Sequence, residues 1–223
     1  VGHGGGSGYI AVMGLIGLSS FMIKPTGLLL NMIVSSTAFY YFYKNGYFRI
    51  SLLWPFLIGS IPMAYVGGSI LLPEIVYKGF VGVVLLFAAA RLFFVTEITE
   101  KQRKSPKLVP AIFVGMIIGL LSGLIGVGGG IFLSPLLLFL GWGRLKEVAA
   151  VSSAFVCINS IAGLIGHLQS VSNVPSAIWL FGVIVWLGGI IGSTLGSQKF
   201  SEIKIQTALS IVLLIAGVKM IVF

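Results

Sequence analysis

Charge is scarce in this sequence, and one acidic residue type is missing altogether. Only 9% of the 223 residues are charged, and none of them is aspartate. Soluble globular domains carry about 25% charged residues, so the composition excludes that class. The five glutamates lie in or beside the segments that connect apolar runs: Glu74, Glu97, Glu100, Glu147 and Glu202. A relay of buried carboxylates that carries protons through a membrane is therefore not expected in this chain.

Cysteine and the common nucleotide-binding motifs are also lacking. Cys157 is the only cysteine, which excludes an internal disulfide and a thiolate metal cage. The sequence has no G-x-x-x-x-G-K-[ST] motif for a P-loop. Its glycine-rich segments lack the strand and the ribose-binding acid of a dinucleotide fingerprint. We therefore expect no metal, no cofactor and no ATP hydrolysis by this chain itself.

Long apolar segments dominate what is present. The chain is 57% hydrophobic, with a mean hydropathy of +1.11. Uncharged runs long enough to cross about 30 Å of hydrocarbon recur, which predicts an all-α polytopic protein in the lipid bilayer. A net charge of +9 would suggest nucleic acid for a soluble protein. Here the basic residues lie between apolar segments, where they set topology, so no nucleic-acid partner is expected. We expect helices at 7–21, 26–43, 51–72, 76–94, 108–125, 130–140, 148–168, 176–196 and 205–223.

A cluster of glycines occurs twice in these apolar surroundings. Gly2-His3-Gly4-Gly5-Gly6 returns 124 positions later as Gly126-Val127-Gly128-Gly129-Gly130, and Asn31 matches Asn159. This repeat divides the chain into a first repeat (1–94), a cytoplasmic linker (95–107) and a second repeat (108–223). The uncharged run 108–125 precedes the second cluster, whereas only Val1 precedes the first. We therefore expect the first repeat to be N-terminally incomplete and to lack one apolar helix in this chain.

The basic residues predict how the two repeats sit in the membrane. If each glycine cluster forms a re-entrant-like helical hairpin followed by three transmembrane helices, 11 of the 14 basic residues lie inside and 3 outside. If each pair instead crosses once as a broken helix, the same count is 8 against 6. The positive-inside rule favours the first arrangement, in which the repeats are inverted. Loops 44–50, 95–107, 141–147 and 197–204 are then cytoplasmic, and 22–25, 73–77 and 169–175 external.

Each glycine cluster precedes the start of a short helix, at Ser7 and at Ile131. Helix N-termini expose unpaired N–H groups and a partial positive charge, and glycines let these groups converge on a ligand. Two such ends that meet near the midplane would bind a small anion without a buried basic side chain. The candidate substrate-binding residues are Gly2, His3, Gly4, Gly5, Gly6, Ser7 and Asn31 in the first half. In the second half they are Gly126, Gly128, Gly129, Gly130, Ile131, Ser152, Ser153 and Asn159.

Other interpretations of the same residues remain open. The glycines would also serve close helix packing, and the two asparagines would also serve as hydrogen-bond links between helices. Gly5-Gly6-Ser7-Gly8 fits the GxSG pattern of intramembrane serine proteases, with Ser7 as nucleophile and His167 or His3 as base. Ile131 replaces Ser7 in the second half, which argues against a protease, and we expect no enzyme. Glycine loops that meet at midplane would also suit an anion channel.

The chain resembles the TauE/SafE sulfite exporter family, also called the toluenesulfonate uptake permease family. The resemblance rests on Gly126–Gly130, on Pro135, on Ser152-Ser153 with Asn159-Ser160 and Gly163, and on Gly2–Gly6 with Leu30-Asn31. It implies a multi-pass, bacterial-type inner-membrane transporter for sulfite, organosulfonates or similar small anions, without an attached ATPase. The expected mechanism is a secondary transporter or facilitator working by alternating access, with a homo-oligomer left open. His3 is a departure from the pattern and would supply a titratable group.

Overall fold

The computed structural model describes residues 6–94, 106–168, 183, 187 and 202–222 of the chain. These residues form helices and contain no strand, which confirms the all-α class. The helices are α1 (Gly6–Ile16), α2 (Ser20–Lys44), α3 (Ile50–Ser69), α4 (Glu74–Phe94), α5 (Leu108–Ile125), α6 (Gly130–Phe139), α7 (Leu145–Gly166) and α9 (Glu202–Val222). Within the described part, three segments are long and apolar enough to cross a membrane: Ile50–Ser69, Leu108–Ile125 and Lys146–Gly166. Most of the helix predicted at 176–196, and residues 95–105 of the linker predicted at 95–107, lie outside the described residues.

The two helices that follow the glycine clusters are short. α1 has 11 residues and α6 has 10, so each is about 16 Å long, roughly half of the hydrocarbon thickness. α1 ends at residue 16 and not at the predicted residue 21 because Gly17 takes a φ of +83°. The N–H groups of Gly17 and Leu18 then donate back to the carbonyls of Gly14 and Met13, which closes the helix.

The predicted external loop at residues 22–25 is wrong, because these residues belong to α2. The chain reverses at 17–19 instead, and the N–H groups of Met22 and Ile23 donate to the carbonyl of Ser19 at the start of α2. Pro25 lies in the second turn of the helix, where its missing N–H costs one hydrogen bond to the preceding turn. The other connections agree with the predicted loops to within a few residues, at 45–49, 70–73 and 140–144.

Glycines hold α3 and α5 at close range. A Cβ atom at Gly115, Gly119 or Gly123 of α5 would lie between 2.1 and 2.3 Å from carbonyl oxygens of α3. These glycines are spaced four residues apart, so they form one small-residue stripe along the helix, and the backbones approach without side chains between them. Close helix packing, the alternative role of glycine given above, therefore explains Gly115, Gly119 and Gly123.

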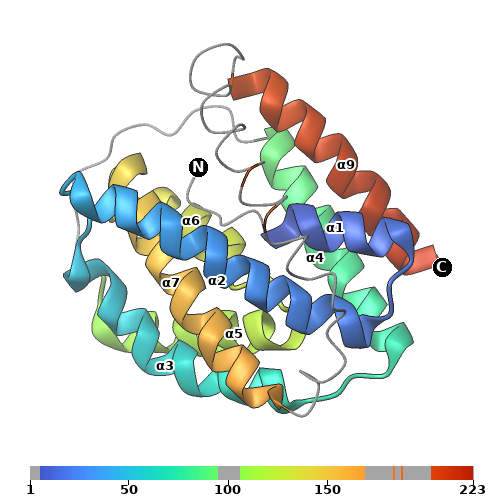
Figure 1. The fold of residues 1–223 in the computed structure, drawn as a ribbon. Coiled ribbons are helices and arrows are strands. Elements are labelled where there is room, and N and C mark those ends of the chain that lie inside the picture. Colours follow the sequence, from blue (N-terminus) through green and yellow to red (C-terminus); the bar gives the residue numbers. More distant parts are fainter. Residues whose placement is uncertain (1–5, 95–105, 169–182, 184–186, 188–201, 223) are drawn as a thin grey trace.

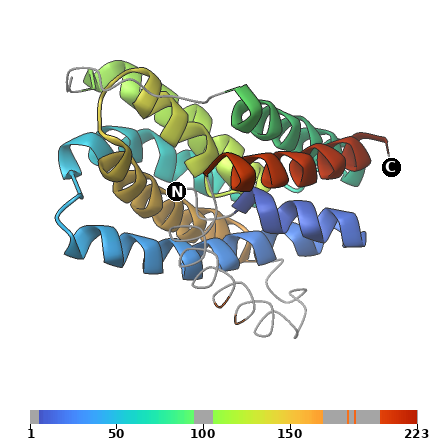
Figure 2. The ribbon, with the colours of Figure 1, turned by 90° about the horizontal axis from the view of Figure 1, so that it is seen from above.

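The corresponding helices of the two halves pack as antiparallel pairs. α2 runs along α7, so that Leu28 lies against Gly163, and α4 runs along α9, where Gly82 lies against Gly217. In Figures 1 and 2, α1, α4 and α9 lie together on one side of the molecule, and α2, α3, α5 and α7 on the other. Gly6 and the residues between α5 and α6 meet where the two groups adjoin, since a Cβ atom at Gly6 would lie 2.7 Å from the carbonyl oxygen of Val127.

Candidate functional site

Gly6 and the second glycine cluster lie about halfway along the long helices. Gly6, at the start of α1, contacts Asn31 near the middle of the 25-residue helix α2. Gly128 contacts Val156 near the middle of the 22-residue helix α7. This depth follows from the lengths of the elements, because α1 and α6 are half-length helices that turn back onto α2 and α7.

The backbone of the second glycine segment requires glycine at three positions. Gly126, Gly128 and Gly129 have φ values of +88°, +78° and +81°, in the left-handed region that disfavours side chains. Gly126 ends α5 by donating to the carbonyl of Ser122 at 2.8 Å, and Gly129 precedes the first residue of α6. The N-terminal N–H groups of α6 therefore begin inside the bundle, where helix geometry gives them no intrahelical acceptor.

Asn31 connects the two glycine segments. It is fully buried, its Nδ2 donates to the carbonyl of Gly126 at 3.0 Å, and its Oδ1 accepts a hydrogen bond from the hydroxyl of Tyr9. A Cβ atom at Gly6 would lie 2.7 Å from the carbonyl oxygen of Val127. The start of α1, the middle of α2 and the end of α5 thus meet at one place, which we call the glycine junction.

Asn159, the counterpart of Asn31 in the sequence, has different partners. Its Nδ2 donates to the carbonyl of Phe155 in its own helix at 2.9 Å. Within the described residues, its Oδ1 and the hydroxyl of the next residue, Ser160, have no hydrogen-bond partner although both are buried. A Cβ atom at Gly128 would lie 3.1 Å from the Ser160 hydroxyl oxygen. The unpaired Ser160 hydroxyl therefore borders the junction on the α7 side, where a ligand would satisfy it.

The structure does not bring every predicted site residue to the junction. The hydroxyl of Ser152 bonds that of Ser134 at 2.8 Å, and the hydroxyl of Ser153 donates to the carbonyl of Ala150 at 2.9 Å. Gly129 directly follows Gly128 at the edge of the junction, and it packs against Ile118 and Phe155. The remaining second-half candidates, Gly130 and Ile131, are buried, and Ser7 is partly buried next to Gly6. His3 and the glycines at 2, 4 and 5 lie outside the described residues.

Two tyrosines at the junction were missed by sequence reasoning. Tyr9 donates to Asn31, and the hydroxyl of the buried Tyr77 donates to the carbonyl of Ile125 at 2.9 Å. Tyr9 lies one turn after Gly6 in a helix without charged residues. Its closeness to the glycine cluster could therefore have identified it as a site residue from the sequence. For Tyr77, 48 positions away from its partner, the sequence carries no comparable signal.

Lys24 and His167 are both buried. Lys24 was predicted to lie in the external loop at 22–25, but the exposed fractions of Lys24 and His167 are only 4% and 3%. Lys24 Nζ donates to the carbonyls of Gly67, Gly68 and Ile70 at 3.0 Å each, and His167 Nδ1 contacts the carbonyl of Gly68. The carbonyls at the C-terminus of α3, which are left without intrahelical partners, attract both basic groups.

The comparisons with known proteins identify one family model and several membrane transporters that this chain resembles. Residues 1–220 match the family model described as "Sulfite exporter TauE/SafE". A probable membrane transporter protein of Sinorhizobium fredii is 36% identical over 99% of this chain and 91% of its own length. A second, from Methanocaldococcus jannaschii, is 30% identical over 77% of this chain and 65% of its length. A third, YunE of Bacillus subtilis, is 25% identical over 92% and 80%. No solved structure matches the chain.

Proposed function

Because this chain belongs to the TauE/SafE sulfite exporter family and is a membrane transporter, we propose that it carries small anions through the glycine junction. Sulfite or an organosulfonate is the leading substrate, and the chain works as a secondary transporter or facilitator by alternating access. The strongest support for this proposal is the contact that forms the glycine junction. Gly6, Asn31 and Val127, which are distant in the sequence, meet halfway along the long helices.

The polar groups around the junction suit an anion. The starts of α1 and α6 supply N–H groups and partial positive charge. The carbonyls of Ile125 and Gly126 at the end of α5 would repel an anion, but donors from Tyr77 and Asn31 cover them. The described glutamates, Glu74, Glu147 and Glu202, lie in the first turns of their helices. Glu74 and Glu147 also pair with Lys78 and Arg49. Negative charge therefore stays away from the junction.

The distribution of basic residues supports a multi-pass arrangement in a bacterial-type inner membrane with inverted repeats. The antiparallel pairs α2 with α7 and α4 with α9 join corresponding helices of the two halves, as an inverted repeat requires. Basic residues gather at the end of the bundle where α2 ends and α3, α5 and α7 begin: Lys44, Arg49, Lys107, Arg144 and Lys146. Three others, Lys24, Lys78 and Lys219, belong to the opposite end, which we place outside.

Electrical potential alone would drive export of an anion from a cell that is negative inside. The gain is about 2.3 kcal/mol per charge per 100 mV, so a monoanion such as bisulfite needs no coupled ion. This is consistent with a chain whose described membrane helices carry no carboxylate away from their ends.

Flux measurements on purified protein in liposomes test the proposal. We expect saturable flux of sulfite or an alkanesulfonate that increases when the potential is negative on the side the anion leaves, and much slower flux of chloride. Rapid, non-saturating chloride current would show a channel instead. A Ser7→Ala variant should retain most of the flux, because the site uses backbone groups. Equal flux in Gly129→Leu and wild-type protein, with both well folded, would overturn the proposal.

A further inference from the structure

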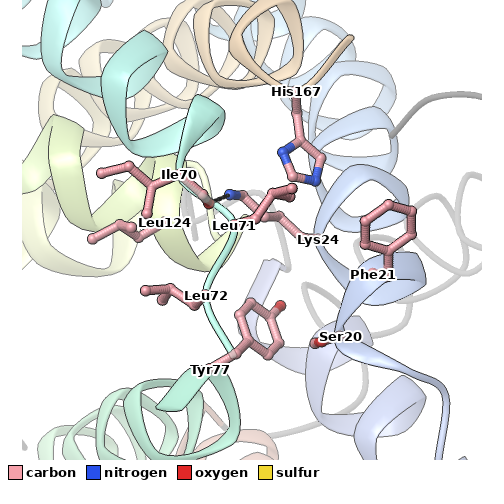
Figure 3. A pocket seen from close by; sticks show the side chains of 9 residues that line it. All are labelled: Ser20, Phe21, Lys24, Ile70, Leu71, Leu72, Tyr77, Leu124 and His167. Carbon is pink, nitrogen blue, oxygen red and sulfur yellow. Dashed lines mark hydrogen bonds between the residues drawn. The ribbon is translucent and has the colours of Figure 1, made fainter. Parts of the chain in front are cut away.

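A pocket lies at the end of the bundle where α2 and α4 begin and α3 and α7 end. Its volume is about 40 Å³, which is room for about three water molecules and so comparable to one small oxyanion. Buried Lys24, Tyr77 and His167 line its interior, while Leu71 is 57% exposed at its rim. Figure 3 shows the imidazole of His167 on one side of this space, with Phe21 beside it and the Lys24 chain behind Leu71.

The pocket carries positive charge without a carboxylate to balance it. Within the described residues, no carboxylate lies within ion-pair distance of Lys24. All three protons of its ammonium group are directed at carbonyl oxygens at the C-terminal end of α3, those of Gly67, Gly68 and the following Ile70. The C-terminus of a helix carries only about half a negative charge, so the ammonium remains incompletely neutralised.

His167 supplies an unused polar atom in the same pocket. Its Nδ1 faces the carbonyl of Gly68, an acceptor, and must therefore carry a proton. Within the described residues, its buried Nε2 has no hydrogen-bond partner. In neutral imidazole this nitrogen is an acceptor, and in imidazolium it becomes a donor. Burial first, and then the nearby Lys24 ammonium, lower the pKa of His167, which follows the last residue of α7.

The pocket adjoins the glycine junction. A Cβ atom at Gly126 would lie 2.8 Å from the carbonyl oxygen of Lys24, so the helix turn that carries Lys24 packs on the end of α5. Tyr77 lines the pocket and also donates to the carbonyl of Ile125. An anion in the pocket would thus be separated from the junction by about one helical turn.

We propose that this pocket is a second binding site for a small oxyanion. The charge of Lys24 attracts the anion, and a hydrogen bond joins Nε2 of His167 to one of the anion's oxygens. The proposal rests on the proposed function, because it places a waiting site at the outer end of the anion's route. Two protonation states give this hydrogen bond. In one, imidazolium donates to a fully ionised anion, and in the other, a protonated oxyanion donates to neutral imidazole. The other titratable groups facing His167 in the pocket are Lys24 and Tyr77.

Binding of methanesulfonate to the purified full chain tests the site. This anion does not titrate near neutral pH, so any pH dependence belongs to the protein. Because imidazolium donates to the anion, affinity should rise as the pH is lowered from about 7 to about 5. Loss of one charge-assisted hydrogen bond corresponds to about tenfold or more in the dissociation constant.

His167→Asn is the informative variant, because its amide can keep the hydrogen bond to Gly68 while Nε2 is removed. We expect it to bind methanesulfonate about tenfold more weakly at the lower pH and to lose the pH dependence. Leu71→Trp is a second variant that fills the mouth of the pocket from an exposed position and should also weaken binding. Lys78→Gln is the charge control, since Lys78 pairs with Glu74, and it should bind as wild type. Wild-type affinity and pH dependence in both His167→Asn and Leu71→Trp would overturn the site, as would pH-independent binding in the wild type.

Gly129→Leu separates this inference from the proposed function. If the variant loses flux but keeps pH-dependent binding, both proposals hold. If it loses flux while His167→Asn still binds as wild type, only the second site is wrong. If it retains wild-type flux while His167→Asn binds weakly, the pocket stands and the junction is wrong.

Discussion

One methyl group added at Gly6 tests whether the two glycine segments must touch for transport to occur. The added Cβ atom would lie 2.7 Å from the carbonyl oxygen of Val127 and 2.8 Å from Oδ1 of Asn31. Ordinary van der Waals contact begins at 3.4 Å, so the backbones would have to separate by about 0.7 Å. The nearest atom belongs to the backbone and cannot rotate away.

Gly8 provides a matched control two residues further along α1. A Cβ atom there has nothing within 4 Å. Alanine is a better helix former than glycine by up to about 1 kcal/mol, so Gly8→Ala should be neutral or slightly stabilising. Gly6→Ala should instead be destabilised by about 1–3 kcal/mol, the usual cost of an added methylene in a packed site.

The two variants are compared by thermal unfolding in detergent and by flux in liposomes. We expect Gly8→Ala to match the wild type in both, and Gly6→Ala to unfold at a lower temperature and to lose most of its flux. The hydrogen bonds of Asn31 to Gly126 and Tyr9 would be stretched by the same displacement. If Gly6→Ala and Gly8→Ala have the same stability and the same flux, the junction is not a close contact that transport depends on.

Two further pairs of variants test other parts of the argument. Asn31→Leu should lower stability, because it leaves the buried carbonyl of Gly126 without its donor, at about 1–3 kcal/mol, and removes the hydrogen bond that Tyr9 donates. Asn159→Leu removes only one bond within its own helix and should unfold within about 1 kcal/mol of the wild type yet lose flux, whereas normal flux would show that its amide does not contact the substrate. Gly119→Ala would place a Cβ atom 2.3 Å from the carbonyl oxygen of Ser60, while Gly79→Ala on α4 meets nothing within 4 Å. Thermal unfolding should show a loss of about 1–3 kcal/mol for the first and none for the second, and equal stabilities would contradict the close packing of α3 on α5.

The helices and the glycine breaks could be predicted from the sequence because both depend on local chemistry. Apolar runs without charge predict the long helices, and a run such as Gly126–Gly130 cannot continue one. The start of α2 could not be predicted in the same way. A lysine next to a proline, at positions 24 and 25, is typical of a loop, and only the carbonyls of α3 explain why Lys24 lies inside a helix. Such a partner, 43 or more positions away, leaves no local signal.

The partners of the matched asparagines show a second limit of reasoning from the repeat. At the offset of 124 positions that aligns the glycine clusters, Tyr9 corresponds to Leu133. The second half therefore has no hydroxyl at the place where Tyr9 donates to Asn31. Equal positions in the two repeats did not imply equal contacts.

Because of this difference, we expect the two asparagines to have different roles, one structural and one in binding the substrate. Both hydrogen-bonding groups of the Asn31 amide are engaged by Gly126 and Tyr9, so Asn31 joins the halves and has little left to offer a ligand. Leu133 offers no hydroxyl, and within the described residues Oδ1 of Asn159 and the hydroxyl of Ser160 have no partner. A carbonyl oxygen only accepts hydrogen bonds and would repel a bare anion, so of these two atoms the Ser160 hydroxyl is the donor. The oxygen of Asn159 would then accept a hydrogen bond from a protonated species such as bisulfite. We therefore expect Ser160→Ala to weaken the flux of every anion that the protein carries. Asn159→Asp, which places a negative charge beside the junction, should reduce anion flux more strongly than Asn159→Leu, and the opposite order would refute this division of roles.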